Sequence, residues 1–487
     1  AIGKVRRMSE LKLPEAVPDD GILVGYSLEH ERHAPVVGFA FGSEHENAAT
    51  GFLEPIVYKG GCHLLTIAPT GAGKGVNSII PTLLQHPGSI ILIDPKGENY
   101  AVTARRRREM GQRVILLDPF LMTDAQTRDT FNPLDLIDTD TPGAVDEAAV
   151  LAEMIAPATN THDPFWENRA RQLITGLLLH VASIRPPILK NLSEVRYLLN
   201  QTADDIGFTA KEMRKSRLED VRMMASIIDT AESRVRASIV STAQQQMEFM
   251  RGKLVSGAMS RSSFPLEDVT RGEGLSIYLV IPPDKLDSHR QMLRLWVGAL
   301  MVLLLRRRHP PALNTLFMLD EAAQLGPLRQ LRQAITLLRG YGLQTWSFWQ
   351  DLSQLTQLYP DAWETMLNNC RVIQAFGFTN LHMTRQLADR IGYENPQELL
   401  NLDADEMLLM IAGDEPVIAQ RPNYLSDPCF RGQADPNPFH NREIETETTA
   451  VRPRRRFSRA SGKAAIQDAM ARAPECSGDG AERLDGK

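Results

Sequence analysis

A glycine-rich stretch with a single lysine is the first set of residues that could do chemistry. It follows the apolar run Leu64 to Ile67 and opens a helical pattern that continues to Gln85. A turn in this position presents backbone N–H groups to phosphate oxygens, and its lysine reaches the β- and γ-phosphates of a nucleotide. We therefore expect a phosphate-binding loop for ATP. Its residues are Ala68, Pro69, Thr70, Gly71, Ala72, Gly73, Lys74, Gly75 and Val76.

This stretch departs from the common phosphate-loop pattern at two positions. Ala68 stands where the first glycine is usual, and Gly75 stands where a Ser or Thr hydroxyl usually contacts Mg²⁺. The alternative is an accidental glycine-rich turn between a strand and a helix. The order of strand, loop and helix favours the phosphate-binding interpretation.

A pair of carboxylates at the end of an apolar run is the second candidate. The run Thr315 to Leu319 is followed directly by Asp320 and Glu321. A Mg²⁺-dependent ATPase needs one carboxylate for the metal and another for the attacking water. We expect Asp320 to hold Mg²⁺ and Glu321 to orient or deprotonate the water. A solvated acidic turn or a helix amino terminus is the alternative.

Gln350 and Arg339 complete the candidate catalytic set. Gln350 ends the strand predicted over Thr345 to Trp349, and a side chain there points into the ligand crevice, where it could sense the γ-phosphate. Arg339 ends a predicted helix and could reach a neighbouring subunit's nucleotide as an arginine finger. Arg371 is a weaker finger candidate. The ordinary alternatives are a polar strand end and an arginine at a helix terminus.

Three other segments carry charges or aromatic rings. The turn Asp94 to Glu98 ends a strand beside the phosphate-loop strand, so it faces either the same crevice or solvent. The run Arg105 to Arg108 is spread around a helix axis by its spacing, which predicts a solvated face rather than a DNA contact. Phe165 and Trp166 open a helix, where we expect them to pack in the core.

The elements that position these residues alternate between apolar strands and helices. Continuous apolar runs between helices are typical of a parallel sheet that is covered on both faces. The alternation stops at about residue 140 and resumes at Leu275, and the residues between show helical periodicity alone. The sequence thus predicts an α/β fold, a P-loop NTPase with a mainly parallel central sheet and an all-α inserted domain.

Five parts follow from this pattern along the chain. The first is a β-rich segment with strands over Ile22 to Tyr26 and Val36 to Phe41. A hairpin around Gly413 and Asp414 ends the folded region, and a polar tail that we expect to be disordered follows. The predicted parts are the β-rich segment 1–60, the first part of the nucleotide-binding domain 61–140, the all-α insertion 141–268, the second part of the nucleotide-binding domain 269–432, and the tail 433–487.

Composition limits the possible partners and compartments. The 487 residues carry a formal net charge of −6, which excludes a uniformly basic nucleic-acid coat and leaves DNA contact to a local patch. Four scattered cysteines argue against a disulfide framework and against a zinc site. The longest apolar run, Leu295 to Leu305, is shorter than the roughly 20 residues of a membrane helix, so we expect a buried core helix. Because Ala1 is not methionine, we expect a segment to have been removed before it.

Several motifs in one order resemble those of the TraG-type coupling proteins of type IV secretion systems. The motifs are Ala68 to Val76, Asp94 to Glu98, Phe131 to Asp135, Asp163 to Trp166 and Leu319 to Ala322. The resemblance covers about residues 50 to 430, and in this family glycine normally follows the lysine of the loop.

The resemblance implies a RecA-like motor domain interrupted by a helical domain. It also implies a homo-hexamer that hydrolyses ATP at its subunit interfaces, with Arg339 as the finger and Gln350 as the γ-phosphate sensor. Its partners would be DNA or protein substrates and components of the secretion channel. The implied location is the cytoplasmic face of the bacterial inner membrane, with attachment through a segment that this chain lacks.

Two other functions remain open on the sequence. The ring could be a substrate-docking receptor that uses nucleotide as a switch, since Gly75 supplies no hydroxyl for Mg²⁺. A chromosome-partitioning DNA translocase shares the motor fold. It would normally end in a winged-helix DNA reader, where this chain has a polar tail.

Overall fold

The computed structural model describes residues 13–27, 53–157, 164–229, 232–337, 339–414 and 416–440. The chain divides into two units, Ala1–Pro438 and Phe439–Lys487, and every element given below belongs to the first. The predicted strand Val36 to Phe41 lies outside the described residues.

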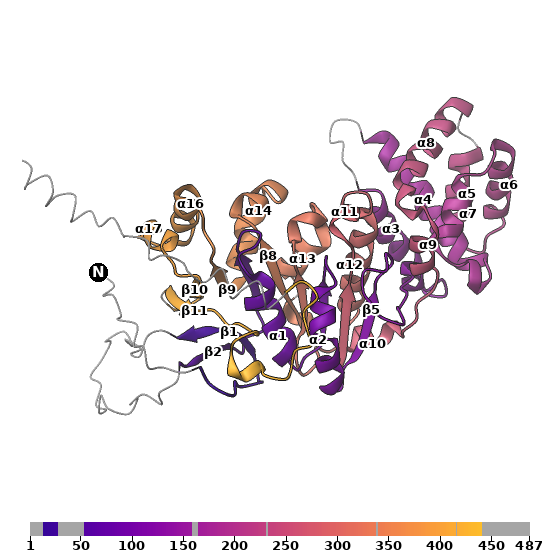
Figure 1. Cartoon of the computed structure of the whole chain (residues 1–487). Helices are drawn as coiled ribbons and strands as arrows, with labels where there is room; N and C mark the ends of the chain where they lie inside the picture. The colour runs from indigo at the N-terminus through magenta and orange to yellow at the C-terminus, as the bar shows by residue number, and fades with distance from the viewer. Residues whose placement is uncertain are drawn as a thin grey trace, which may run out of the picture. The chain divides into compact units, whose positions relative to one another are not determined.

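One sheet of eleven strands runs through the described part of the first unit (Figure 1). Its order is β2-β1-β11-β10-β9-β3-β8-β7-β4-β6-β5. The strands from β9 to β5 in this order are parallel to one another, and the four at the other end pair antiparallel. The bounds are β1 Ile22–Ser27, β2 Pro55–Tyr58, β3 His63–Ile67, β4 Ile90–Ile93, β5 Arg113–Leu117, β6 Leu275–Leu279, β7 Thr315–Leu319, β8 Leu343–Trp349, β9 Cys370–Ala375, β10 Glu406–Ile411 and β11 Val417–Gln420.

The central strands are buried along their whole length, as their sequences require. Every residue of β3, β4, β6, β7 and β8 is buried. Strands that are buried on both faces need helices or loops over both sides of the sheet, as in parallel α/β sheets. The prediction of a mainly parallel, doubly covered sheet is confirmed.

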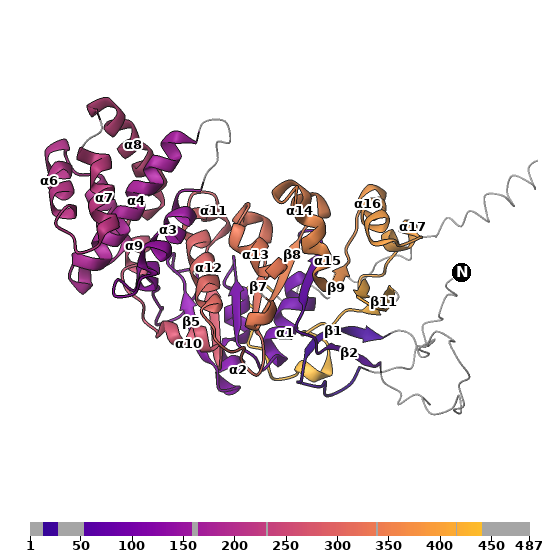
Figure 2. The same cartoon turned by 180° about the vertical axis from the view of Figure 1, so that it is seen from behind.

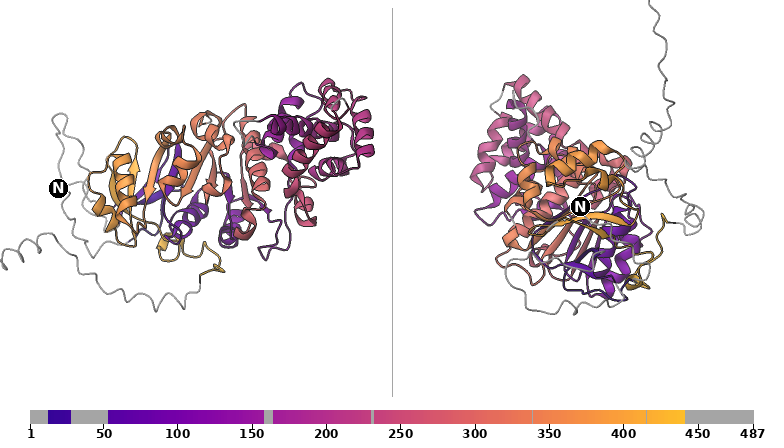
Figure 3. Two further views of the ribbon diagram at one scale, coloured as in Figure 1. Left: turned by 90° about the horizontal axis from the view of Figure 1, so that it is seen from above. Right: turned by 90° about the vertical axis from the view of Figure 1, so that its left-hand side faces the viewer.

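Helices cover the two faces of the sheet, as Figure 3 shows. On one face, Leu83 of α1 packs with Leu64 and Leu92 in one core cluster. On the other face, Leu300 of α12 belongs to the cluster that holds Leu65. The helices outside the insertion are α1 Ile80–Gln85, α2 Glu98–Glu109, α11 Pro283–Leu286, α12 Arg290–Leu305, α13 Arg329–Leu337, α14 Leu352–Leu358, α15 Trp363–Asn368, α16 Leu381–Ile391 and α17 Pro396–Leu400.

Between β5 and β6 the described residues form helices and no strand (Figures 1 and 2). The long helix α4 lies at the centre, with Leu173, Leu177 and Val181 fully buried, and α3, α5, α7 and α8 pack against it. The boundaries of this part as a separate domain stay a prediction. Its helices are α3 Ala144–Ile155, α4 Phe165–Ile184, α5 Leu192–Leu199, α6 Ala203–Met213, α7 Glu219–Asp229, α8 Ser233–Gln246, α9 Lys253–Ala258 and α10 Leu266–Arg271.

Two predictions about side-chain surroundings were wrong. Arg107 is fully buried, because its guanidinium donates to the carbonyls of His86 and Gly88 and to Ser276 Oγ (2.8 Å), and so the basic run is not simply a solvated face. Phe165 and Trp166 are 46% and 37% exposed rather than packed in the core. They open the first turn of α4, and its buried residues begin only at Ala170.

The start of the predicted tail is also more structured than expected. Arg105 Nε donates to Asp435 Oδ1 at 2.7 Å, and Asn437 Nδ2 donates to Glu98 Oε1 at 2.7 Å. Residues 433–437 therefore lie against α2. The prediction for the rest of the tail falls almost entirely outside the described residues.

The remaining predictions from composition fit the structure where it describes them. The run Leu295 to Leu305 belongs to α12, which is buried along most of its length. Within the described ranges, no helix combines the length and apolar character that a membrane crossing requires. Cys62, Cys370 and Cys429 are free and buried.

Candidate functional site

Three strand ends bring the predicted site residues other than Arg339 to one edge of the sheet. In the parallel register, Ile67 of β3 faces Trp349 of β8, and Ser347 of β8 faces Leu319 of β7. The phosphate loop leaves β3, Gln350 follows β8, and the acidic pair follows β7, so all three leave the same carboxyl edge. Ligands of open α/β sheets bind at this edge.

Glycines shape the phosphate loop. Gly71 and Gly73 have φ of +79° and +94°, which side-chain-bearing residues rarely adopt. A Cβ on Gly73 would also lie 2.4 Å from Asn77 Oδ1. After Lys74 the chain enters a π-helical turn, Gly75–Ile79, before α1 begins, so the helix predicted from Lys74 to Gln85 is of two kinds. Such π turns often occur at functional sites.

Lys74, Glu321 and Gln350 are joined by their side chains. Lys74 Nζ lies 3.0 Å from Glu321 Oε1 in a largely shielded ion pair, with 9% and 22% of the two side chains exposed. Gln350 Nε2 donates to Glu321 Oε2 at 2.9 Å. One carboxylate oxygen of Glu321 therefore contacts Lys74, and the other accepts a hydrogen bond from Gln350, the predicted γ-phosphate sensor.

Glu321 itself has an unusual backbone. Its φ of +57° is left-handed, which is uncommon for a residue with a side chain and is often found at functional positions. The short turn Ala322–Leu325 follows, and Arg294 Nη1 from α12 donates to the carbonyls of Leu325 (3.1 Å) and Pro327 (2.9 Å). These two bonds hold the segment that follows the acidic pair.

The surroundings of Asp320 disfavour the ionised form of its carboxyl group. Its Oδ1 is shut off from solvent and has no hydrogen-bond partner among the described residues. Burial raises the pKa of Asp320 to about 7, with Lys74 opposing the shift and Glu321 and Asp94 adding to it. Asp94 follows β4, which pairs with β7 and β6, so the prediction that this strand lies beside the phosphate-loop strand β3 was wrong. Burial raises the pKa of Asp94 to about 6. A divalent cation would relieve this concentration of buried negative charge.

The residues present fit a magnesium ion bound mainly through a nucleotide. No group of three or more His, Cys, Asp or Glu side chains in the described ranges forms a metal cage. Mg²⁺ in phosphoryl-transfer sites usually has one or two carboxylates, with waters and phosphate oxygens as its other ligands. The unpartnered Oδ1 of Asp320 is the protein atom best suited to that role.

Arg339 lies at the opposite edge of the sheet from Lys74. It belongs to the turn Arg339–Tyr341, which precedes the amino end of β8, and its charge helps to lower the pKa of His63 at the start of β3. A five-residue strand is roughly 16 Å long, so Arg339 does not reach the site of its own chain. Arg371 also lies elsewhere, with Nη1 donating to Ala412 O at 2.8 Å.

A match to a known family identifies this arrangement. The family described as "Type IV secretory system Conjugative DNA transfer" matches residues 28–395. The chain belongs to this family. The resemblance to TraG-type coupling proteins that the motifs predicted is thereby confirmed.

Curated relatives of this conjugative-transfer chain include a conjugal transfer protein and a protein named VirD4. It is 25% identical to the conjugal transfer protein TraG of Escherichia coli over 440 residues, which cover 76% of this chain and 68% of TraG. It is 27% identical to the protein VirD4 of Agrobacterium fabrum over 408 residues, which cover 76% of this chain and 59% of VirD4.

Solved structures of the plasmid coupling protein TrwB have a similar fold. The unbound monoclinic form aligns with a TM-score of 0.60 at 18% identity and covers 79% of this chain and 89% of TrwB. TrwB with an ATP analogue aligns with a TM-score of 0.58 at 19% identity and covers 74% of this chain and 84% of TrwB. The predicted RecA-like fold, with its mainly parallel sheet and added helices, is confirmed.

Sequence reasoning missed the residues that hold the phosphate loop and the turn after it. They come from β9 and from the segment that follows β11. Arg421 Nη1 donates to Ala72 O at 2.7 Å, and Asn77 Nδ2 donates to Pro422 O at 2.7 Å. Gln374 Oε1 accepts from Ser78 Oγ at 3.2 Å. The one available signal was Gln374, a polar residue within the apolar run Val372 to Phe376.

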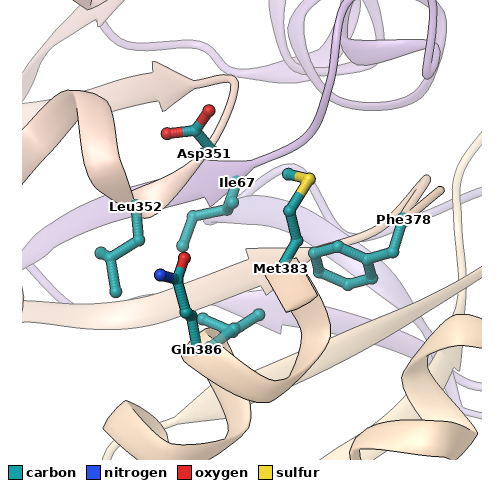
Figure 4. Close-up of a pocket in the computed structure, with 7 residues that line it drawn as sticks. Ile67, Asp351, Leu352, Phe378, Met383 and Gln386 are labelled. Atoms are coloured by element: carbon teal, nitrogen blue, oxygen red, sulfur yellow. The ribbon is translucent and has the colours of Figure 1, made fainter. Parts of the chain in front are cut away.

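A small, mostly apolar pocket lies beside the end of β3 (Figure 4). Its walls come from β3, from the segments that follow β8 and β9, and from α16, and none of the predicted catalytic residues lines it. The lining residues are Ile67, Asp351, Leu352, Phe378, Met383, Gln386 and Leu387.

Proposed function

We propose that this chain is the ATP-hydrolysing coupling protein of a type IV secretion system, and that it delivers DNA, alone or with bound protein, to the secretion channel. The observation that carries the proposal is the convergence of Lys74, Glu321 and Gln350 next to Asp320, whose Oδ1 is shut off from solvent. This is the set of groups that phosphoryl transfer to water requires.

The proposed division of labour follows from the geometry. Amides of residues 71–75 and Lys74 would bind the phosphates, and Asp320 would hold Mg²⁺, which supplies charge neutralisation when bound. Glu321 would leave Lys74 and accept a proton from the attacking water, and Gln350 would keep its carboxylate in place. TrwB has been described in complex with ADPNP, with GDPNP, and with ADP and Mg²⁺, which supports nucleotide binding by this chain.

Arg339 supports the further proposal of a homo-hexamer. Because Arg339 lies at the far edge of the sheet, it would not reach a nucleotide bound to its own chain. It could reach a nucleotide bound to the neighbouring protomer. In a ring, each site would combine Lys74 of one protomer with Arg339 of the next, so the isolated monomer should hydrolyse ATP poorly. We place this ring at the cytoplasmic face of the bacterial inner membrane, beside the channel.

Two substitutions test this function. Lys74→Ala should abolish nucleotide binding and turnover. Glu321→Gln should still bind ATP but lose at least about 100-fold in turnover, and it should stall secretion in cells. If Lys74→Ala retained full ATPase activity, the site would be wrong.

The receptor alternative rests on Gly75, which provides no hydroxyl for Mg²⁺. A receptor that uses nucleotide only as a switch would secrete normally with Glu321→Gln, provided that the variant still binds ATP. Secretion by this variant therefore separates the two functions.

A further inference from the structure

The phosphate loop is held from outside by a residue that lies about 350 positions further along the chain. Arg421 Nη1 donates to Ala72 O at 2.7 Å. The guanidinium also lies over the ring of Phe376, with its carbon 4.6 Å from the ring centroid. A planar cation fixed on an aromatic face has little freedom to turn away, so the bond to Ala72 is directed.

The bond to Ala72 O determines where the next amide points. In a planar trans peptide the C=O and the following N–H point in opposite directions. Because the carbonyl of Ala72 is drawn toward Arg421, the N–H of Gly73 is turned away from it. Gly73 has φ of +94°, a region that a loose loop would leave easily, so this peptide needs an external restraint.

Independent contacts hold the same segment in place. Gly377 approaches so closely that a Cβ there would lie 2.5 Å from Ala72 Cβ. Asn77 Nδ2, in the turn after the loop, donates to Pro422 O at 2.7 Å. Ala72 is therefore packed against the segment that follows β9, and the loop and the turn after it are bonded to residues 421 and 422.

The restraint continues into the antiparallel part of the sheet. Arg421 N donates to Asp405 O at 2.8 Å, and β11, which ends at Gln420, pairs with β1 through Tyr26. Tyr26 OH also donates to Asp427 Oδ2 at 3.2 Å, and the same oxygen accepts from Asn423 N at 2.8 Å. The segment that carries Arg421 is thus anchored to the amino-terminal strand.

From these contacts we propose that Arg421 is a positioning residue for nucleotide binding. It acts through the peptide between Ala72 and Gly73 and presets the phosphate loop in its binding conformation before nucleotide arrives. The effect on nucleotide affinity rests on the function proposed above, whereas the effect on the loop itself does not.

The test compares Arg421→Ala with a matched control in the full chain. Arg171 is also partly buried, and its Nε donates to a backbone carbonyl, that of Ala156, at 2.8 Å, but it belongs to the helical part. Arg171→Ala therefore removes a similar hydrogen bond from an arginine to a backbone carbonyl, at a site distant in the chain from the phosphate loop. Amide hydrogen exchange of residues 69–76 is measured without nucleotide, and the dissociation constant of a fluorescent ADP is measured by titration.

We expect Arg421→Ala to accelerate exchange in residues 69–76 and to weaken fluorescent ADP binding by about tenfold, the usual effect of losing a hydrogen bond with a charged donor. Arg421→Lys should recover part of both effects, because lysine can donate but cannot lie flat on Phe376. Arg171→Ala should leave both quantities unchanged, even if it lowers the melting temperature as much.

The proposal is overturned if Arg421→Ala leaves loop exchange at the wild-type rate, or if Arg171→Ala weakens ADP binding equally. If the wild-type chain does not bind the fluorescent ADP, the proposed function fails. The exchange measurement on nucleotide-free protein then still decides whether Arg421 positions the loop.

Discussion

Lys74 Nζ lies 3.0 Å from Glu321 Oε1, so the lysine expected to bind phosphate is held by the carboxylate expected to activate water. A bound γ-phosphate would have to take the lysine from that carboxylate, and it would also meet the negative charge of Glu321. Both effects oppose binding. We therefore expect Glu321→Gln to bind ATP about three- to tenfold more tightly than the wild type, because a neutral amide releases Lys74.

Titration of a fluorescent, non-hydrolysable ATP analogue measures this difference. Lys74→Ala serves as the control that should bind least. Equal or weaker binding by Glu321→Gln would show that the ion pair does not compete with nucleotide.

Gln350 should affect turnover more than binding. Its amide donates to Glu321 Oε2 at 2.9 Å, so Gln350→Ala frees the carboxylate to rotate without removing any phosphate contact. We expect kcat to fall about tenfold with little change in KM, as measured by steady-state ATPase kinetics. A rise in KM with unchanged kcat would instead assign Gln350 to substrate binding.

Asp320 should reduce stability at alkaline pH in the absence of metal. The folded chain keeps a proton on Asp320 up to a pH of about 7, whereas the unfolded chain loses it near 3.8. The folded state therefore loses stability as the pH rises from about 3.8 to 7, and above pH 7 the full cost of the disfavoured charge is present. Asp320→Asn removes it and should raise the melting temperature by roughly 2 °C at pH 8 without Mg²⁺.

The same substitution should cost activity. Asp320→Asn should lose most of its ATPase activity and its response to Mg²⁺ titration, and removing Mg²⁺ with EDTA should likewise inactivate the wild type. Full Mg²⁺-dependent activity in Asp320→Asn would exclude Asp320 as the metal ligand.

His180 should make the helical part sensitive to acid. It is fully buried in α4, neither ring nitrogen has a hydrogen-bond partner among the described residues, and burial lowers its pKa to about 4. The unfolded chain takes up a proton near pH 6.5, so the stability that neutral His180 contributes is lost as the pH falls from about 6.5 to 4. His180→Leu should therefore lose less stability than the wild type between pH 7.5 and 5, as measured by urea unfolding. His382→Leu, at an exposed position, should behave like the wild type.

Arg339 should act only on a neighbour's nucleotide. Arg339→Ala and Lys74→Ala should each be inactive alone, because every site then lacks one group. Mixing the two variants creates interfaces where an intact loop meets an intact arginine, so ATPase activity should partly return. No recovery in rings shown by sizing to contain both variants would argue against the finger role.

Local patterns in the sequence were sufficient to predict several strands and to select candidate site residues. Apolar runs predicted β3 and β7 within one residue of their bounds, because every residue of both strands is buried. Lys74 could be selected from the glycine-rich loop that follows a strand, and Asp320, Glu321 and Gln350 from their places directly after strands, because each side-chain type has a known chemical use there. Their roles stay predictions until they are tested.

Only the tertiary structure decided which groups meet. The strand order places β8 between β3 and β7, which lets Gln350 and Lys74 share Glu321, and it brings Arg421 to Ala72. The run Arg105 to Arg108 is another example. Its spacing could not predict that the guanidinium of Arg107 is buried and donates to the carbonyls of His86 and Gly88. Local periodicity records which face of an element is apolar, but contacts between residues hundreds of positions apart depend on how the strands are ordered and paired.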